Sequence, residues 1–317
     1  MATLPLAGAL RRESFSFDGE AMRLDQFLVA QLPQYSRMHL KGLIERGCVR
    51  VDGVLCKPRR QLKAGSRVEI SYPAAAIARE GELKDWIIHE DKHLLVLNKP
   101  AGLLMHPLGT SWLTDLRAAL SDVANLAGVL LQARPGIAAA RVPRTGIVHR
   151  LDRQTSGVLL VAKTRTAYEK LLKAFKDRRI EKIYRAIVRG VPQNVSSRVK
   201  APIGRLPGHR RVVVTPFGKS AETGLTVLEA CSGNAIVEAR PISGRTHQIR
   251  AHLALLGHPV AGDPEHEGQN VEPRPERLML HAYRIRLTHP GTGKEVIFKA
   301  ELSADFKAFW KLCRKKR

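Results

Sequence analysis

The chain has 317 residues, of which 53 are Lys or Arg and 29 are Asp or Glu, so its formal net charge is +24. This length allows one large domain or a large and a small one, and the charge favours a polyanionic partner over a membrane or a small acid. No apolar run approaches membrane-spanning length, the first arginines follow the first apolar patch, and the four cysteines form no C-x-x-C pair. We therefore expect a soluble, cytoplasmic, monomeric protein with no membrane contact.

Residues 21–73 predict a small basic module. Two helices come first, in "RLDQFLVAQLP" and "SRMHLKGLIERG", where Ser36 is the expected N-cap and Gly47 the stop. The segment "CVRVDGVLCK" predicts a hairpin that turns at Asp52-Gly53, and "SRVEISYP" predicts a further strand. This order of elements resembles the S-four type RNA-binding module, first known from a protein of the small ribosomal subunit.

Basic side chains concentrate in two stretches without acids, one between Asp52 and Glu69 and the other between Glu181 and Glu222. Contacts to phosphates dominate nucleic-acid affinity, so two such stretches favour RNA or DNA as the partner. The alternative is a cationic surface that serves solubility. The residues expected to contact RNA are Arg37, Lys41, Arg46, Lys57, Arg59, Arg60, Arg205, Arg210 and Arg211.

Residues 74–85 are alanine-rich and unpatterned, and we expect them to be a linker to a larger body, 86–317. In the body, helices are predicted in "SWLTDLRAALSDVANL", in "TAYEKLLKAFKDRR" with a capping box of Thr166 and Glu169, and after Ser303. The strand patterns are "HLLVLNK", "VLLVAK", "EKIYRAIVRG", "HRRVVVTP", "AETGLTVLEA", "NAIVEARPISG", "LMLHAYRIRLTHP" and "EVIFKAEL". Because most strands follow one another directly, we predict an α+β fold with a mixed, mostly antiparallel sheet.

One carboxylate stands out in "GIVHRLDRQTSG", where Asp152 lies between Arg150 and Arg153 in a turn-rich segment before an apolar strand. Cationic neighbours favour the ionised carboxylate, as a nucleophile or general base requires. The alternative is an aspartate that caps the turn or pairs with an arginine. The tripeptide R-L-D also occurs at Arg23–Asp25, but without the following T-S-G, so Asp25 is expected to be an ordinary helix residue.

Two further segments carry candidate groups. On a helical wheel of "THQIRAHLALLG", Arg250 and His247 lie opposite the apolar side chains, so Arg250 could reach toward Asp152. His247 and His252 are five residues apart and on different faces, which argues against a metal site. In "EKIYRAI", Tyr184 could stack on a base or could be a core residue.

The ordered set "NKPAGLLMHP", "GIVHRLDRQTSG", "KIYRAIV", "GKSAETGLTVLE", "ISGRTHQIRAHLALLGHPVAGD" and "LMLHA" resembles the RluA/RluD-type large-subunit ribosomal RNA pseudouridine synthases. The resemblance covers about residues 21–310 and implies the pseudouridine synthase fold, no cofactor and no metal. It assigns the catalytic roles to Asp152, to Tyr184 against the uracil, and to Arg250 as the partner of Asp152. It assigns roles in seating a flipped uridine to Arg150, His149, Leu280 and Arg245.

The sequence departs from the family pattern at two places. The segment "NLAGVLLQARPGIAAARVPR" is longer than expected, and "PEHEGQN" follows "GHPVAGD" where a tyrosine and a glycine are usual. Both are expected in loops, where they would affect the choice of substrate.

Several alternatives stay open at this point. The chain could be a catalytically silent ribosome-assembly factor on the same fold, a base-releasing glycosidase, or an enzyme that acts on transfer RNA. The sequence also leaves open whether Asp152 attacks the ribose, attacks the base or removes a ribose proton.

Overall fold

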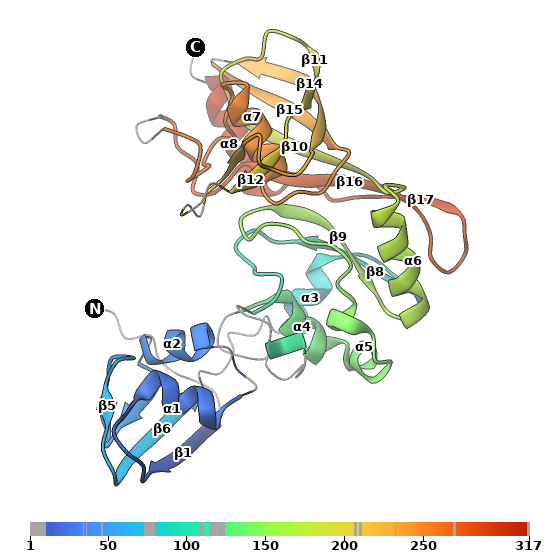
Figure 1. The fold of residues 1–317 in the computed structure, drawn as a ribbon. Coiled ribbons are helices and arrows are strands. Elements are labelled where there is room, and N and C mark those ends of the chain that lie inside the picture. Colours follow the sequence, from blue (N-terminus) through green and yellow to red (C-terminus); the bar gives the residue numbers. More distant parts are fainter. Residues whose placement is uncertain are drawn as a thin grey trace. The chain divides into compact units, whose positions relative to one another are not determined.

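The structure is a computed structural model of the 317-residue chain, and it describes residues 11–33, 35, 37–45, 47–72, 80–107, 111–113, 119, 124–205, 208, 211–231, 233–268 and 271–315. The chain divides into two compact units (Figure 1). The first comprises Met1–Asp85 and Leu104–Thr145, and the second Trp86–Leu103 and Gly146–Arg317.

The first unit contains a small antiparallel sheet in the order β1-β6-β3-β4. Its strands are β1 (Arg11–Phe17), β6 (Ser66–Tyr72), β3 (Val49–Val51) and β4 (Val54–Leu55), and β2 (Met22–Arg23) pairs separately with β5 (Gln61–Leu62). The strand β1 precedes residue 21, where the sequence prediction began the module. It pairs with β6 along its whole length, so the sheet begins earlier in the chain than the hydrophobic patterns indicate.

Two helices, α1 (Leu24–Gln31) and α2 (Arg37–Glu45), complete this module. Leu24 and Leu28 of α1 and Leu40 and Leu43 of α2 are fully buried. The predicted hairpin is confirmed, because Asp52 and Gly53 connect β3 and β4 with φ of 51° and 76°. Gly47, with φ of 76°, follows α2 as expected, whereas the predicted cap Ser36 lies outside the described residues.

The rest of the first unit differs from the sequence prediction. The helix α3 (Glu80–Trp86) occupies the end of the segment predicted to be an unpatterned linker. The predicted helix in "SWLTDLRAALSDVANL" lies mostly outside the described residues. Its first three residues are described and form the 3-10 turn η1 (Ser111–Leu113). The long segment after it forms α4 (Leu126–Ala133) and α5 (Pro135–Ala139), followed by the turn η3 (Pro143–Gly146). Asn125 caps α4 by accepting a hydrogen bond from the Gly128 amide, so this helix begins where the predicted one ends.

The second unit is built on a sheet to which the described residues contribute nine strands, in the order β11-β14-β15-β10-β16-β9-β8-β7, with β17 also paired to β16. The pairing of β16 with β9 is parallel and every other pairing is antiparallel, which confirms the mixed, mostly antiparallel α+β sheet. The strands are β7 (Ile87–Glu90), β8 (Leu94–Lys99), β9 (Ser156–Ala162), β10 (Glu181–Arg189), β11 (Ser196–Lys200), β14 (Glu222–Cys231), β15 (Asn234–Pro241), β16 (Leu280–Thr288) and β17 (Glu295–Lys299). A separate pair, β12 (Ile203–Arg205) and β13 (Val212–Val214), lies outside this sheet.

Three helices belong to the second unit: α6 (Arg165–Lys176), α7 (Gln248–Leu255) and α8 (Ala304–Lys315). Figure 1 shows α7 and α8 beside β10, β14 and β15, where Phe306 and Trp310 of α8 join the buried core. The predicted capping box of α6 is wrong: the hydroxyl of Thr164, not that of Thr166, accepts the hydrogen bond from the Ala167 amide. Within the part of the chain that the structure describes, no helix is long and apolar enough to cross a membrane.

Candidate active site

Asp152 lies in the loop that leads into β9. The Thr155 amide donates to the Asp152 carbonyl over 3.0 Å, which closes a turn around the aspartate. On the other side, Arg153 and Gly102 hold each other, because the Gly102 amide donates to the Arg153 carbonyl and Arg153 Nε donates to the Gly102 carbonyl, over 2.7 and 3.0 Å. The segment just after β8 therefore fixes the position of the loop that carries Asp152.

A cavity of about 490 Å³ opens beside this loop. All seven residues predicted for catalysis and for seating the base line it: Asp152, Tyr184, Arg250, Arg150, His149, Leu280 and Arg245. They come from the catalytic loop, β10, β16, α7 and the segment before α7, so the sheet collects side chains that are far apart in the sequence. Among the described residues that line the cavity, Asp152 is the only acid.

Tyr184 and Leu280 belong to adjacent strands, β10 and β16. The Leu280 side chain is buried and gives the cavity an apolar wall, as the sequence predicts. Burial and then the charge of Asp152 raise the pKa of Tyr184 above its ordinary value. Tyr184 therefore presents a protonated phenol near Asp152 at neutral pH.

The predicted direct pair between Arg250 and Asp152 is not formed. Arg250 is buried and makes two hydrogen bonds to Asp263, from Nε to Oδ2 over 2.8 Å and from Nη2 to Oδ1 over 2.6 Å. Its Nη2 also lies 3.2 Å from Glu265 Oε1. Burial alone would lower the pKa of Arg250, but Asp263, Glu265 and, in a smaller part, Asp152 raise it. Arg250 and Asp152 thus interact electrostatically without forming a direct ion pair.

His247 is the basic side chain that the structure places against Asp152. The sequence did not identify it as a partner of Asp152. Its Nε2 is 3.8 Å from Asp152 Oδ2, and its Nδ1 is 3.3 Å from Glu265 Oε1. His247 precedes α7 with φ of 53°, in the left-handed region, and this backbone places the ring between the two carboxylates. Glu265 belongs to the unusual "PEHEGQN" segment, so that departure lies next to the candidate site.

The buried side chain of Gln248 fixes the segment that forms the rim of the cavity. Its Oε1 accepts from the Ser243 hydroxyl and from the Arg245 amide, and its Nε2 donates to the Glu222 carbonyl and to Thr223 Oγ1. The Arg245 side chain is exposed and its Nε donates to the Ser220 carbonyl over 3.2 Å. Arg150 is also exposed, so both arginines are accessible at the cavity.

His149 lines the cavity but is engaged by the backbone. Its Nε2 accepts a hydrogen bond from the Leu160 amide over 2.9 Å, and its ring lies against Phe175. Burial, with a smaller effect of Lys182, lowers the pKa of His149 to about 3, so the ring is neutral at neutral pH. His149 therefore holds the loop that carries Asp152 against β9 through the Leu160 amide. Lys182, two residues before Tyr184 on the same face of β10, also lines the cavity, and the alternation of the strand could have identified it.

Lys99, the last residue of β8, is fully buried and contacts the loop that carries Asp152. Its Nζ donates to the carbonyls of Pro100, Leu103 and Arg153 over 2.7, 3.0 and 3.4 Å. Burial lowers the pKa of Lys99 to about 7, and the charge of Asp152 acts against this decrease. Lys99 is therefore a titratable group whose pKa responds to the charge of Asp152.

One group of described residues could offer three ligand atoms to a metal: His89, Asp91 and His289. However, His289 Nδ1 already accepts from the amides of Gly291 and Thr292 over 3.3 and 3.1 Å. His289 Nε2 lies 2.9 Å from Asp91 Oδ2. These contacts favour a structural turn over a metal centre at these residues.

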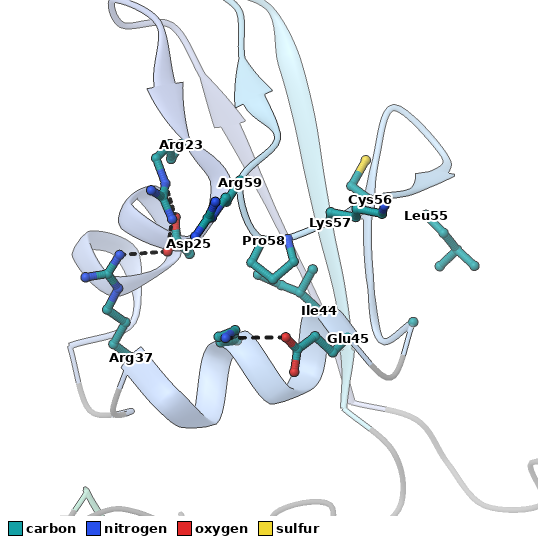
Figure 2. A pocket seen from close by; sticks show the side chains of 12 residues that line it. Arg23, Asp25, Arg37, Ile44, Glu45, Leu55, Cys56, Lys57, Pro58 and Arg59 are labelled. Atoms are coloured by element: carbon teal, nitrogen blue, oxygen red, sulfur yellow. Dashed lines mark hydrogen bonds and ion pairs between the residues drawn. The ribbon is translucent and has the colours of Figure 1, made fainter. Parts of the chain in front are cut away.

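The first unit carries a separate groove of about 1260 Å³, shown in Figure 2. Arg23 and Arg37 converge on the buried carboxylate of Asp25 over 2.8 to 2.9 Å. Burial alone would raise the pKa of Asp25, but these two arginines lower it. Asp25 thus orients two guanidinium groups at the groove, and it is more than an ordinary helix residue.

The predicted RNA-contacting residues are distributed over both units. Arg37, Lys41, Lys57 and Arg59 line the groove of the first unit, and Arg60 is exposed next to it in the chain. Arg205 and Arg211 are exposed in the second unit, at the end of β12 and just before β13. Arg46 and Arg210 lie outside the described residues.

Comparisons with known proteins match the segments of the chain that contain the groove and most of the residues lining the cavity. The model of the RNA pseudouridylate synthase family matches residues 93–255, and that of the S4 domain matches residues 22–68. The chain is 36% identical to the ribosomal large subunit pseudouridine synthase D of Nitrosomonas europaea, over 92% of this chain and 85% of the relative. It is 35% identical to the protein of the same name from Pseudomonas aeruginosa, over 97% of both chains. Among solved structures, human RNA pseudouridylate synthase domain containing 4 covers 74% of this chain and 95% of its own, with 25% identity and a TM-score of 0.59.

Proposed function

Since the chain belongs to the RNA pseudouridylate synthase family and is therefore an isomerase that acts on RNA, we propose that it converts uridine to pseudouridine in large-subunit ribosomal RNA, with Asp152 as the catalytic carboxylate. The choice of ribosomal RNA rests on the names of the similar proteins from Nitrosomonas europaea and Pseudomonas aeruginosa. The role of Asp152 rests on the geometry of the cavity.

The observation that carries the proposal is a cavity with a single acid, an aromatic ring and an apolar wall, formed by Asp152, Tyr184 and Leu280. The isomerisation breaks the bond from ribose to nitrogen 1 of uracil, rotates the base and forms a bond from ribose to carbon 5, which loses its proton, while nitrogen 1 gains one. It needs no second carboxylate, whereas glycoside hydrolysis ordinarily uses two. Asp263 and Glu265, the acids nearest to Arg250, are engaged with that arginine instead.

The size and position of the cavity suit a base that has left its stack. Enzymes that modify a base generally move the nucleotide out of the helix into such a pocket. A cavity of about 490 Å³ falls within the range of small-molecule sites. Arg150 and Arg245 are accessible at the cavity, where they can contact the phosphates next to the flipped uridine.

The test is the release of tritium from carbon 5 of uridine in a transcript of the large-subunit ribosomal RNA. The wild type should release tritium to water, and Asp152→Asn should slow this at saturating RNA by at least about 100-fold. Asp25→Asn, in the second R-L-D tripeptide, is the matched control: it should weaken RNA binding and leave the rate at saturating RNA nearly unchanged. Undiminished release by Asp152→Asn would contradict the role of Asp152.

The same assay separates the alternative functions. Appearance of free uracil would identify a base-releasing glycosidase. RNA binding without either product would identify a silent assembly factor. Release from a transfer RNA transcript in place of the ribosomal transcript would keep the chemistry and change the substrate.

A further inference from the structure

Phe217 is the most exposed large apolar side chain in the described part of the chain, with 93% of its surface accessible. Single exposed apolar residues are common on protein surfaces. A phenyl ring this exposed leaves its apolar face free for a ligand, and burying that face would be favourable. Phe217 contacts no apolar cluster of the described residues. The segments around it explain how the ring is presented.

The turn that carries Phe217 is held rigidly by backbone contacts. The Gly218 amide donates to the Thr215 carbonyl over 2.9 Å, and Lys219 exchanges two hydrogen bonds of 2.9 Å with Ile203. Gly218 is packed so closely that a Cβ at this position would lie 2.4 Å from the Ile203 carbonyl carbon. The ring is therefore presented by a fixed scaffold, which lowers the entropic cost of binding.

Three cations on the strands and turn next to Phe217 in the chain have no ion-pair partner among the described residues. Lys219 is two residues away, Arg205 ends β12 two residues after Ile203, and Arg211 precedes β13, which pairs with β12. All three side chains are exposed. An exposed aromatic ring among accessible cations is the arrangement with which proteins bind unpaired nucleic-acid bases.

The turn also lies close to the cavity along the chain. Phe217 and Ser220 are three positions apart in the chain, which limits the distance between their Cα atoms to about 11 Å. The Ser220 carbonyl accepts a hydrogen bond from Arg245, which lines the cavity. Phe217 is therefore linked through Ser220 and Arg245 to the rim of the cavity.

We propose that Phe217 is a stacking site for an unpaired base of the substrate RNA, next to the uridine that enters the cavity. This inference rests on the proposed function. Removing one base from its stack leaves its neighbours without a stacking partner, and a rigid phenyl ring replaces that partner. Lys219, Arg205 and Arg211 hold the backbone of the same RNA segment.

The first test compares Phe217→Ala with Lys219→Ala on the tritiated ribosomal transcript. Phe217→Ala should raise KM about tenfold, leave kcat within about twofold, and keep the wild-type dependence of binding on salt, because stacking releases no counterions. Lys219→Ala should reduce the slope of log K against log salt by about 0.7 to 0.9. Val195→Ala removes another exposed apolar side chain of the same unit and should change none of these values.

The second test observes the contact directly. In Phe217→Trp, the fluorescence of the added indole, taken as the difference from the wild type, should be quenched when the transcript binds, and KM should stay near the wild-type value. Phe217→Leu keeps an apolar side chain but no aromatic face, so it should behave like Phe217→Ala.

The outcomes separate this inference from the proposed function. Unchanged KM in Phe217→Ala, with no quenching in Phe217→Trp, would overturn the stacking site while tritium release by the wild type upholds the enzyme. If Phe217→Ala sediments more slowly than the wild type and binds RNA with unchanged affinity, the stacking site is also overturned. The ring would then be a contact to a second copy of the chain. No tritium release by the wild type would contradict the proposed function, and the quenching assay would still decide whether Phe217 contacts RNA.

Discussion

Asp152 lies near two groups, Tyr184 and Lys99, whose pKa values are shifted mainly by burial. Tyr184 is kept protonated by burial and by the Asp152 charge itself, so the phenol is a weaker acid than usual as long as Asp152 is ionised. Once Asp152 loses its charge to a bond or a proton, that part of the increase in the pKa of Tyr184 disappears. The aspartate and the tyrosine are therefore coupled, and the state of one changes the acidity of the other.

Lys99 gives the protein a pH-dependent stability that a substitution can remove. Below about pH 7 the lysine is protonated in both the folded and the unfolded chain, and the cost of burying its charge is fully present. Above pH 7 the folded chain releases this proton, whereas the unfolded chain keeps it up to its ordinary pKa of 10.5, so the contribution of Lys99 to the free energy of unfolding rises with pH.

We expect the free energy of unfolding of the wild type, minus that of Lys99→Met, to increase by roughly 2 kcal/mol between pH 7 and pH 9. Urea unfolding at both pH values measures this difference. Lys92→Met, at an exposed lysine of the loop before β8, is the control and should show no such increase. Parallel pH dependences of the wild type and Lys99→Met would contradict the prediction.

The residues of the site could be predicted from the sequence where a local motif places them, and less well where a partner comes from a distant loop. Asp152 lies in the loop before a recognisable strand pattern, Tyr184 lies within one and Leu280 begins one, and the structure brings them to one cavity. The helical wheel placed Arg250 opposite the apolar side chains, but it could not show that Arg250 is buried against Asp263, which reaches it from the loop after α7. Lys99 reads as a lysine at a strand end, and only the fold shows that it is buried.

At the scale of single elements, the start of α6 shows how the chain chooses between two neighbouring caps. Thr164 and Thr166 both satisfy the residue preference for an N-cap. The chain leaves β9 at Ala162, and Thr164 has extended dihedrals, φ of −129° and ψ of 155°, so the helix begins immediately after it. The geometry at the end of the strand, which no local pattern contains, therefore decided the position.

Thr164→Ala should lower the free energy of unfolding by about 1 kcal/mol, because the Ala167 amide loses its acceptor. Thr166→Ala should change it by less than about 0.5 kcal/mol, since Thr166 is exposed within the first turn. Chemical denaturation of the two variants beside the wild type measures both values. Equal losses in the two variants would show that the assigned cap is incorrect.

At the scale of the whole molecule, the two units carry different parts of RNA recognition. The groove of the first unit has oriented arginines and no candidate catalytic set, whereas the second unit has the cavity and its own exposed cations. Exposed cations thus occur in both units, which fits the proposed roles of the first unit in docking and of the second in chemistry. The sequence predicted this division from composition, but it missed β1, whose short alternating segment precedes the basic patterns.

Replacing Lys57 and Arg59 in the groove by alanine should reduce the slope of log K against log salt by about 1.5 for binding of the ribosomal transcript, as expected for the loss of two phosphate contacts. The rate of tritium release at saturating RNA should remain close to that of the wild type, because neither residue lines the cavity. A double substitution of Lys92 and Lys311, two exposed lysines of the second unit, controls for net charge alone. An unchanged slope in the groove variant would remove the first unit from RNA docking.

The parallel pairing of β9 with β16 has a consequence for the way the protein is made. Ser156 and Gly157 join His281 and Ala282, and the hydroxyl of Ser156 is 2.9 Å from His281 Nδ1 across 125 residues of chain. A ribosome synthesises Asp152 long before it reaches the strand that supplies Leu280. The cavity beside Asp152 can therefore be completed only after most of the chain has been synthesised.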